Sequence, residues 1–477
     1  MSVLKTSLRQ IRQDLQEPGQ RALLLLAMIP LFPEYISFFI VVLAGAFAWQ
    51  ELKQTNRPLQ IGVIGKLLLA FIGYMFITIL YSRKPPNSIA TVAMWAFFFL
   101  MYLILYNLLT DTDRFDSFML YITGVAGIVG FVACCQYRLG FFIKGVPNQM
   151  WAWLDELVYQ VLPLNPGYSR YVLRACSTFS NPNILSEYLT AVAPFVVYFN
   201  FYERRPELRL FCRICLFLTF SGVLFSFSRG GYLAILALAL ALVLFNVRHK
   251  FATVTLYIVC ILLLLPEEVM ERFLTILPGI SVGGAILGST NETGGNLLTE
   301  EAMNTTAEIL NNSGADLAIN ERFRIWLQAL KMFVENPIFG QGAGTEITHQ
   351  IMAENNINAL HAHNIALQLL VEGGIIALFI MLLIGGKVAK NGLELMRNGY
   401  SYSFWIGFAV LGFVSSFCIQ GLVDYPLLTP KLIANFMMIM AITERSVFLY
   451  TAKGIPVRKK IRHHFKNYRQ KNKQTNN

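Results

Sequence analysis

The sequence predicts an all-α polytopic membrane protein. Of its 477 residues, 55% are apolar and only 14% are charged, and its mean hydropathy is +0.52. Soluble globular domains are typically about 45–50% apolar and about 25% charged. Apolar stretches long enough to cross a bilayer recur from end to end, and basic residues gather in alternate short loops between them. These observations exclude a soluble domain that carries a single membrane anchor.

About twelve membrane-spanning helices are expected. Pro30, Pro33 and Glu34 interrupt one long apolar run and divide it into the first two spans. The expected spans are residues 22–32, 34–50, 59–80, 88–109, 117–136, 184–202, 208–226, 231–247, 251–265, 363–386, 403–423 and 430–449. They form a single transmembrane domain over residues 22–449, between a basic leader (1–21) and a basic tail (450–477).

The distribution of basic residues predicts the orientation, because Lys and Arg in short loops stay on the cytoplasmic side. With both termini inside, the expected cytoplasmic segments hold roughly two thirds of the 39 Lys and Arg residues. The net charge of +11 then reflects topology and attraction to anionic lipids, so the membrane is the expected partner and nucleic acid is not.

Two long loops, residues 137–183 and 266–362, are expected on the outer side, each with a short amphipathic helix. In the first, Trp151, Leu154, Val158 and Leu162 form one apolar stripe, which suits a helix lying at the membrane surface. In the second, a helix is expected from a cap at Asn320 to the Asn-Pro pair at 336–337. Since both loops face one compartment, the chemistry is expected there.

Four arginines on the expected outer side are candidate ligands of a diphosphate: Arg174, Arg229, Arg322 and Arg324. An arginine beside the bilayer is costly unless it meets an anion or a carboxylate, and its planar guanidinium matches phosphate oxygens. The connection at Arg229 is short, and the two glycines that follow it allow a ligand to approach the backbone. Interfacial anchoring or a helix–loop contact is the alternative for the other three.

The segment LHAHNIALQLLVEGG (360–374) places two histidines and an asparagine at the start of an expected span. If both were helical, His361 and His363 would point about 200° apart, which makes a poor metal chelate unless the chain is still extended there. No metal is therefore expected. One histidine is expected to begin the helix and to accept a proton from a hydroxyl nucleophile, with Asn364 orienting the ring or a sugar. A polar helix end that satisfies its own backbone is the alternative.

Four blocks of sequence resemble the superfamily of O-antigen ligases and O-antigen polymerases. STFSNPNILSEYL (177–189), with Asn181 and Asn183, resembles its Thr-Phe-Gly-Asn-Pro-Asn segment, although Ser180 replaces the usual glycine. FSFSRGGYLA (225–234) resembles its Ser-Arg-Gly span start, and RFRIWLQALKMFVENPIFGQGAGT (322–345) its arginine-led helix with Pro-x-x-Gly-x-Gly. HAHNIALQLLVEGGIIA (361–377) resembles the ligase signature of His-Asn, nine residues and Gly, with Ala377 departing from it.

The resemblance implies a metal-independent glycosyltransferase without cofactors in the bacterial cytoplasmic (inner) membrane, acting on the outer face. Its donor would be a polyprenyl-diphosphate-linked glycan, and its acceptor a lipid, a glycan or a protein. Carried over by position, Arg229 and Arg174 would hold the diphosphate, Arg322 or Arg324 would close over it, and His363 would be the catalytic base. Substrate contacts are expected at His361, Asn364, Asn181 and Asn183. Inversion at the anomeric carbon would follow from a single displacement.

Several alternatives remain open at this stage. A ligase transfers a finished glycan, whereas a polymerase joins lipid-linked repeat units, and the sequence does not separate the two. A transporter or flippase would also have about twelve spans, but the sequence shows no internal repeat and few charges within the spans. An inactive scaffold is the third class. Glu187, Glu372 and Asp424 lie near expected span ends, where each would either assist the reaction or pair with an arginine.

Overall fold

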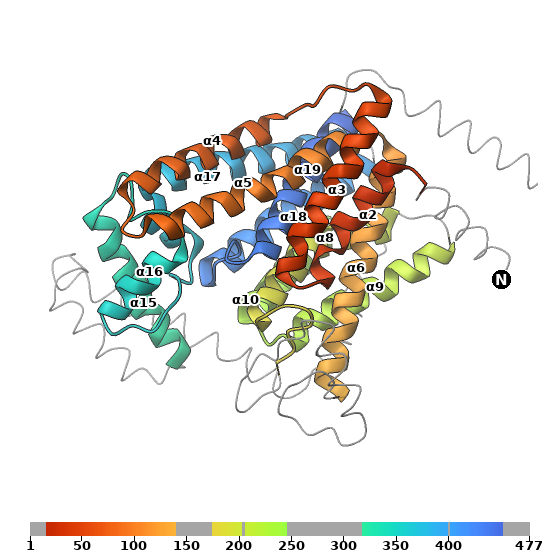
Figure 1. Ribbon diagram of the computed structural model, residues 1–477. Helices are drawn as coiled ribbons and strands as arrows, with labels where there is room; N and C mark the ends of the chain where they lie inside the picture. Colours follow the sequence, from red (N-terminus) through yellow and green to blue (C-terminus); the bar gives the residue numbers. More distant parts are fainter. Residues whose placement is uncertain (1–15, 140–173, 203–205, 246–316, 399–400, 452–477) are drawn as a thin grey trace, which may run out of the picture.

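The computed structural model describes residues 16–139, 174–202, 206–245, 317–398 and 401–451, and Figure 1 shows them as a bundle of long helices. Within these ranges there are helices and turns but no strands, so the expected all-α class is confirmed for this part of the chain. Nine helices in the described residues are long and apolar enough to cross a membrane. The multi-pass architecture is therefore confirmed, whereas the count of twelve is not.

The nine candidate spans follow the expected stretches closely. They comprise α3 (Glu34–Thr55), α4 (Val63–Thr78) extended by η2 (Ile79–Tyr81), α5 (Pro85–Leu108), α6 (Thr112–Leu139), α8 (Pro182–Tyr202), α9 (Pro206–Phe225), α17 (Ile365–Arg397), α18 (Ser401–Val423) and α19 (Pro430–Thr451). Of the other three, the expected span at 251–265 lies outside the described residues, as does the amphipathic stripe at 151–162.

The remaining two expected spans correspond to shorter helical segments within the described residues. The apolar run does break at the prolines, but α2 (Pro18–Met28) and η1 (Ile29–Leu31) together rise only roughly 21 Å, against about 30 Å for the hydrocarbon core. α10 is described over Arg229–Phe245, where the described residues end, so the expected span at 231–247 is described only in part. The described residues therefore contain one apolar segment, α2 with η1, that is too short to cross the bilayer.

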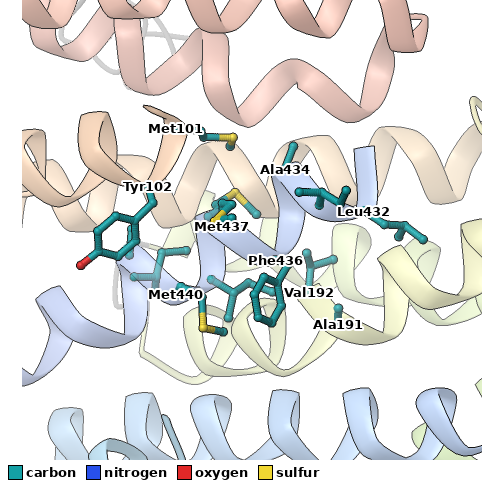
Figure 2. Close-up of a cluster of buried hydrophobic side chains, with 14 of the residues drawn as sticks. Met101, Tyr102, Ala191, Val192, Leu432, Ala434, Phe436, Met437 and Met440 are labelled. Carbon is teal, nitrogen blue, oxygen red and sulfur yellow. The ribbon is translucent and has the colours of Figure 1, made fainter. Parts of the chain in front are cut away.

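Two helices, α8 and α19, form the centre of the bundle. Nearly every described side chain of α8 is buried, and in α19 all side chains from Lys431 to Ser446 are buried. Figure 2 shows Met101 and Tyr102 of α5, Ala191 and Val192 of α8, and five residues of α19 packed in one cluster. Surrounding helices bury one face and expose apolar side chains on the other, as lipid-facing helices do.

The end of the second long loop forms a small helical unit, α15 (Leu317–Glu335) and α16 (Thr345–Glu354), beside one end of the bundle (Figure 1). Ile325, Ala329 and Met332 pack on Ile347 and Ile351 in a separate apolar core. The predicted cap at Asn320 is wrong, because residues 317–319 of α15 are already helical. Its end at Glu335 agrees with the stop predicted from the Asn-Pro pair.

A break in α17 anchors this unit to the bundle. Gly373 and Gly374 leave helical geometry, and Gly374 has a φ of 62°, which glycine adopts without strain. The segment 337–344 supplies the missing hydrogen bonds. Gln341 N–H donates to Val371 O (2.7 Å), Gly342 N–H to Glu372 O (3.0 Å), and Ile375 N–H to the carbonyl of residue 337 (2.9 Å). The arginine-bearing helix and the histidine-bearing helix are thus joined by backbone bonds.

Candidate functional site

The two histidines lie in a short turn before α17, not on the helix. Asn364 caps α17, because its Oδ1 accepts hydrogen bonds from the N–H groups of Ala366 (3.0 Å) and Leu367 (3.1 Å). The prediction that a histidine begins the helix is therefore wrong. His363 itself has a φ of 46°, a left-handed conformation that is costly for a non-glycine residue and often found at functional sites.

This backbone turn brings the two imidazoles together, with ring centroids 4.1 Å apart. Both rings face the carboxylate of Asp424, which follows α18 directly. His363 Nδ1 lies 3.1 Å from Asp424 Oδ1, and His361 Nε2 lies 3.7 Å from the same oxygen. The site therefore contains a histidine–aspartate pair whose members are 61 residues apart in the sequence.

The hydrogen bonds indicate the tautomer of each ring. The carboxylate of Asp424 accepts, so His363 carries its proton on Nδ1 and leaves Nε2 unprotonated. The N–H of His363 donates to His361 Nδ1 (3.2 Å), so His361 carries its proton on Nε2, toward Asp424. In this arrangement, which we assign from the network, His363 Nε2 is the free proton acceptor.

Burial distinguishes the two histidines. The side chain of His361 is 5% exposed, whereas that of His363 is 28% exposed and can reach a substrate. Burial, with the nearby charge of His363, lowers the pKa of His361 to about 4, although Asp424 opposes the shift. Burial alone would raise the pKa of Asp424, but the hydrogen bond from His363 and the surrounding positive charges bring it below its usual range. A neutral His361 and an ionised Asp424 thus support His363 at neutral pH.

The residues around the start of α8 supply the other side of Asp424. Asn183 Nδ2 donates to Asp424 Oδ2 (3.0 Å), and Arg174 Nη2 donates to Asn183 Oδ1 (2.7 Å). Arg174 Nε also donates to the backbone carbonyl of Ser226 (2.9 Å). Asn181 orders the start of α8, because its Oδ1 accepts the N–H of Asn183 (2.8 Å). Arg174 and Asn183 therefore join the site, and Asn181 positions the turn that holds them.

Only one of the two α15 arginines acts on this cluster. The charge of Arg322 influences the protonation of both His361 and Asp424, so Arg322 lies within electrostatic range of the pair. Arg324 is turned to the surface, where it pairs with Glu321 at 3.5 Å and is 53% exposed. The sequence left the choice between them open, and the geometry favours Arg322.

Arg229 is the first residue of α10, and the glycines after it bring this helix close to its neighbours. A Cβ on Gly231 would lie 2.0 Å from Ser186 Oγ of α8, and one on Gly230 would lie 2.4 Å from Gln420 Oε1 of α18. Close approach therefore requires glycine at both positions. Arg229 is thereby placed between the helix that carries Asn183 and the helix that leads to Asp424.

Beneath the pair, Glu187 of α8 is only 4% exposed and interacts electrostatically with Asp424 and Arg322. A cavity of about 10 Å³, room for one water molecule, is lined by Glu187, Ser416 and Asn435. Glu187 Oε2, Ser416 Oγ and Asn435 Oδ1 have no hydrogen-bond partner among the described residues.

A buried lysine, which sequence analysis missed, holds the backbone of the segment that leads into α8. Lys431 Nζ donates to the backbone carbonyl of Thr178 (2.5 Å) and to that of Pro30 (3.4 Å), and it lies 4.7 Å from the ring centroid of Phe179. Asp424 was noticed only as one of three carboxylates near span ends, without its partner. The polar residues of α18 and α19 follow no periodic pattern in the sequence. Nothing local therefore indicated which residues Asp424 and Lys431 would contact.

The two histidines and Asp424 could also hold a metal ion. One ligand atom from each of His361, His363 and Asp424 lies within 4.8 Å of the others, and two imidazoles with a carboxylate are a donor set that zinc accepts. The backbone at the histidines is neither helical nor extended, and it is the left-handed conformation of His363 that brings the two rings together. However, the 3.1 Å separation of His363 Nδ1 and Asp424 Oδ1 is also a good direct hydrogen bond.

Comparison with known proteins identifies one related family. Residues 214–382 match the family model described as O-antigen ligase. The resemblance to the O-antigen ligase superfamily is confirmed. The matched segment runs from α9 into α17 and includes Arg229, Arg322, His361 and His363. No curated protein matches the chain.

The family match and the apolar helices together support a multi-pass membrane glycosyltransferase of the ligase or polymerase type, active in polysaccharide biosynthesis. The match covers roughly a third of the chain. Arg174, Asn183 and Asp424 lie outside it, so their place in the site rests on the structure alone.

Proposed function

We propose that this protein transfers a glycan from polyprenyl diphosphate to an acceptor, by a single displacement in which His363 is the general base. The observation that carries this proposal is the hydrogen bond between His363 Nδ1 and Asp424 Oδ1, which leaves Nε2 as a proton acceptor on a partly exposed ring. An aspartate that fixes the tautomer of a histidine in this way also stabilises the imidazolium that forms when the proton is taken.

In the proposed step, His363 Nε2 removes the proton of an acceptor hydroxyl or amide, and the acceptor attacks the anomeric carbon of the donor sugar. The bond from that carbon to the diphosphate oxygen breaks, and polyprenyl diphosphate leaves with the bonding electrons. Attack and departure on opposite faces invert the anomeric configuration. General-base catalysis of this kind typically contributes about 10²–10⁴-fold.

The leaving diphosphate gains charge, which arginines can stabilise in a site partly shielded from water. Arg322 lies within electrostatic range of the pair, Arg174 is held by Asn183, and Arg229 begins a helix packed against the same two segments. We assign these three guanidinium groups to the diphosphate. The site would face the outer side of the bacterial inner membrane, because the helices α15 and α16 beside it belong to the long loop expected there.

We propose a reaction without a metal ion, because the guanidinium groups would supply the positive charge and Asp424 is already occupied by His363, Asn183 and the N–H of Tyr425. A zinc ion bound by both histidines and Asp424 is the alternative that the donor geometry allows. In that case His363 would be a metal ligand and not a base, and the enzyme would lose activity when a chelator removes the metal.

The test uses purified protein in lipid nanodiscs, supplied with a polyprenyl-diphosphate-linked repeat unit in the presence of EDTA. Wild type is compared with His363→Ala and with His463→Ala, a histidine of the basic tail that serves as the matched control. A ladder of longer lipid-linked chains that is lost only in His363→Ala would identify a polymerase. Growth only after a second acceptor is added would identify a ligase.

The same assay can refute the proposal. Full activity of His363→Ala would exclude the general-base role, and inhibition by EDTA that zinc reverses would favour the metal alternative. Retention of the anomeric configuration in the product, measured by NMR, would exclude a single displacement. Failure with every acceptor would favour the carrier and scaffold alternatives.

A further inference from the structure

A second cavity, of about 390 Å³, lies at the far end of the bundle from the histidines. It is formed by the last turns of α3 and the chain that follows toward α4. α3 begins with Glu34, which interacts electrostatically with Lys431, the lysine that holds the segment leading into α8. The helix then runs 22 residues, or roughly 33 Å, so its other end reaches the opposite side of the bundle.

The turn at the end of α3 shapes this cavity. Asn56 adopts a left-handed conformation (φ 48°), its N–H donates to Lys53 O, and the N–H of Arg57 donates to Leu52 O (3.2 Å). This Schellman-type turn folds the chain back beside the helix. Lys53 and Arg57 consequently both line the cavity, four residues apart.

The charge of the cavity is positive. Lys53 and Arg57 belong to its lining, which contains no acidic residue among the residues that the structure describes. The nearest carboxylate in sequence, Glu51, is buried and bound to Arg114 at 2.6 Å. Buried Arg445 adds a further positive charge close enough to repel Arg57. The negative end of α3 would disfavour an anion here, so these cations must outweigh it.

Apart from Asn56, the rest of the described lining is apolar. Trp49, Leu52, Pro58 and Leu59 complete the walls, and Trp49 and Leu59 are 72% and 65% exposed. Tryptophan at the end of a membrane helix typically lies at the level of the lipid headgroups. A volume of 390 Å³ also falls within the range of small-molecule sites.

We infer that this cavity binds the headgroup of an anionic phospholipid from the surrounding bilayer. Lys53 and Arg57 contact the phosphodiester, while Leu52, Pro58 and Leu59 contact the glycerol and the first acyl carbons. Basic pockets between membrane helices on the cytoplasmic side favour anionic lipids in this way. This lipid site is independent of the glycosyl transfer proposed above.

The terminal segments of the chain are poor competitors for the cavity. Residues 1–15 carry Lys5, Arg9 and Arg12 against a single acidic residue, and residues 452–477 are strongly basic and contain no acidic residue. Neither segment would neutralise Lys53 and Arg57. An anionic lipid supplies the complementary charge and apolar surface together.

The test measures lipid retained by the full-length protein after reconstitution in nanodiscs of phosphatidylglycerol and phosphatidylcholine, followed by native mass spectrometry. Wild type should retain phosphatidylglycerol preferentially. The double variant Lys53→Gln/Arg57→Gln should lose about tenfold or more of that preference. The matched control Lys390→Gln/Arg397→Gln removes two exposed charges near the end of α17, outside the cavity lining, and should behave as wild type.

Equal retention by wild type and the Lys53→Gln/Arg57→Gln variant would overturn the inference, as would the absence of any preference in wild type. An equal loss in the control variant would show that the effect comes from total charge and not from this cavity. If soluble glycerol 3-phosphate displaced phosphatidylglycerol at similar concentrations, the site would be one for a free phosphate ester and not for a membrane lipid.

Discussion

Replacing Asp424 with asparagine isolates the contribution of the aspartate to the proposed base. The substitution keeps the size of the side chain but removes the negative charge that accepts the Nδ1 proton of His363. A hydrogen bond to a charged group contributes about 1.5–3 kcal/mol, which is about tenfold to a hundredfold in rate. If the new amide also donates to Nδ1, the proton of His363 moves to Nε2 and the base is lost. The expected loss therefore rises to about 10²–10⁴-fold.

The assay is glycosyl transfer by the reconstituted enzyme under single-turnover conditions, so that product release does not mask the chemical step. Asp113→Asn is the matched control, because Asp113 is exposed at the start of α6 and takes no part in the site. In the double variant Asp424→Asn/His363→Ala, the loss should be close to that of His363→Ala alone, since the two residues act as a unit.

Three results would refute this reasoning. Near-normal activity of Asp424→Asn beside an inactive His363→Ala would show that the histidine works without its aspartate. Multiplicative losses in the double variant would show that the residues act independently. A lower melting temperature of Asp424→Asn, with activity restored on cooling, would assign the residue to folding alone, because Asp424 also accepts the N–H of Tyr425.

Three further outcomes follow from the geometry. Arg322→Ala should lose about 10²–10³-fold in turnover, whereas Arg324→Ala, whose side chain is at the surface, should stay within about threefold, as steady-state kinetics would show. Gly374→Ala should lower the melting temperature, because the new Cβ would lie 2.2 Å from a backbone carbonyl at a positive φ, whereas Gly385→Ala, with open space around it, should not. Burial lowers the pKa of His361 to about 4 from its ordinary 6.5, so its titration leaves the free energy of unfolding unchanged above pH 6.5 and lowers it by about 3 kcal/mol between pH 6.5 and pH 4, where only the unfolded state takes up the proton. Unfolding titrations of wild type and His361→Gln would measure that difference.

The helical architecture was predictable because hydrophobicity is a local signal. Membrane-spanning helices need about 20 consecutive apolar residues, and the structure has helices close to nearly every expected stretch that it describes. Lengths were harder to predict, because α2 and η1 are largely apolar yet together cover only Pro18–Leu31 before the chain turns at the prolines. Whether such a helix crosses a bilayer or packs inside the bundle depends on its neighbours, which the sequence does not reveal.

The site was predictable in its parts but not in its pairing. Histidine and arginine stand out in an apolar chain, so His363 and the arginines were found from residue type and place. Asp424 lies at the end of a different helix, and nothing local distinguishes a carboxylate that meets an imidazole from one that meets a guanidinium. The choice between Arg322 and Arg324 was open although residues two apart on a helix point about 200° away from each other. The sequence therefore indicated that only one would face the site, but not which one.

The first part of α17 explains why the spacing between His363 and Gly374 matters. Asn364 fixes the start of this part by capping it, and Gly373 and Gly374 fix its end by breaking the helix. His363 lies directly before the capped end. The segment that follows α15, the helix of Arg322, is hydrogen-bonded to the broken end. One residue more or less between them would turn one end by about 100° relative to the other and move it by about 1.5 Å. The general base and the cation opposite it would no longer meet, even with every catalytic side chain present.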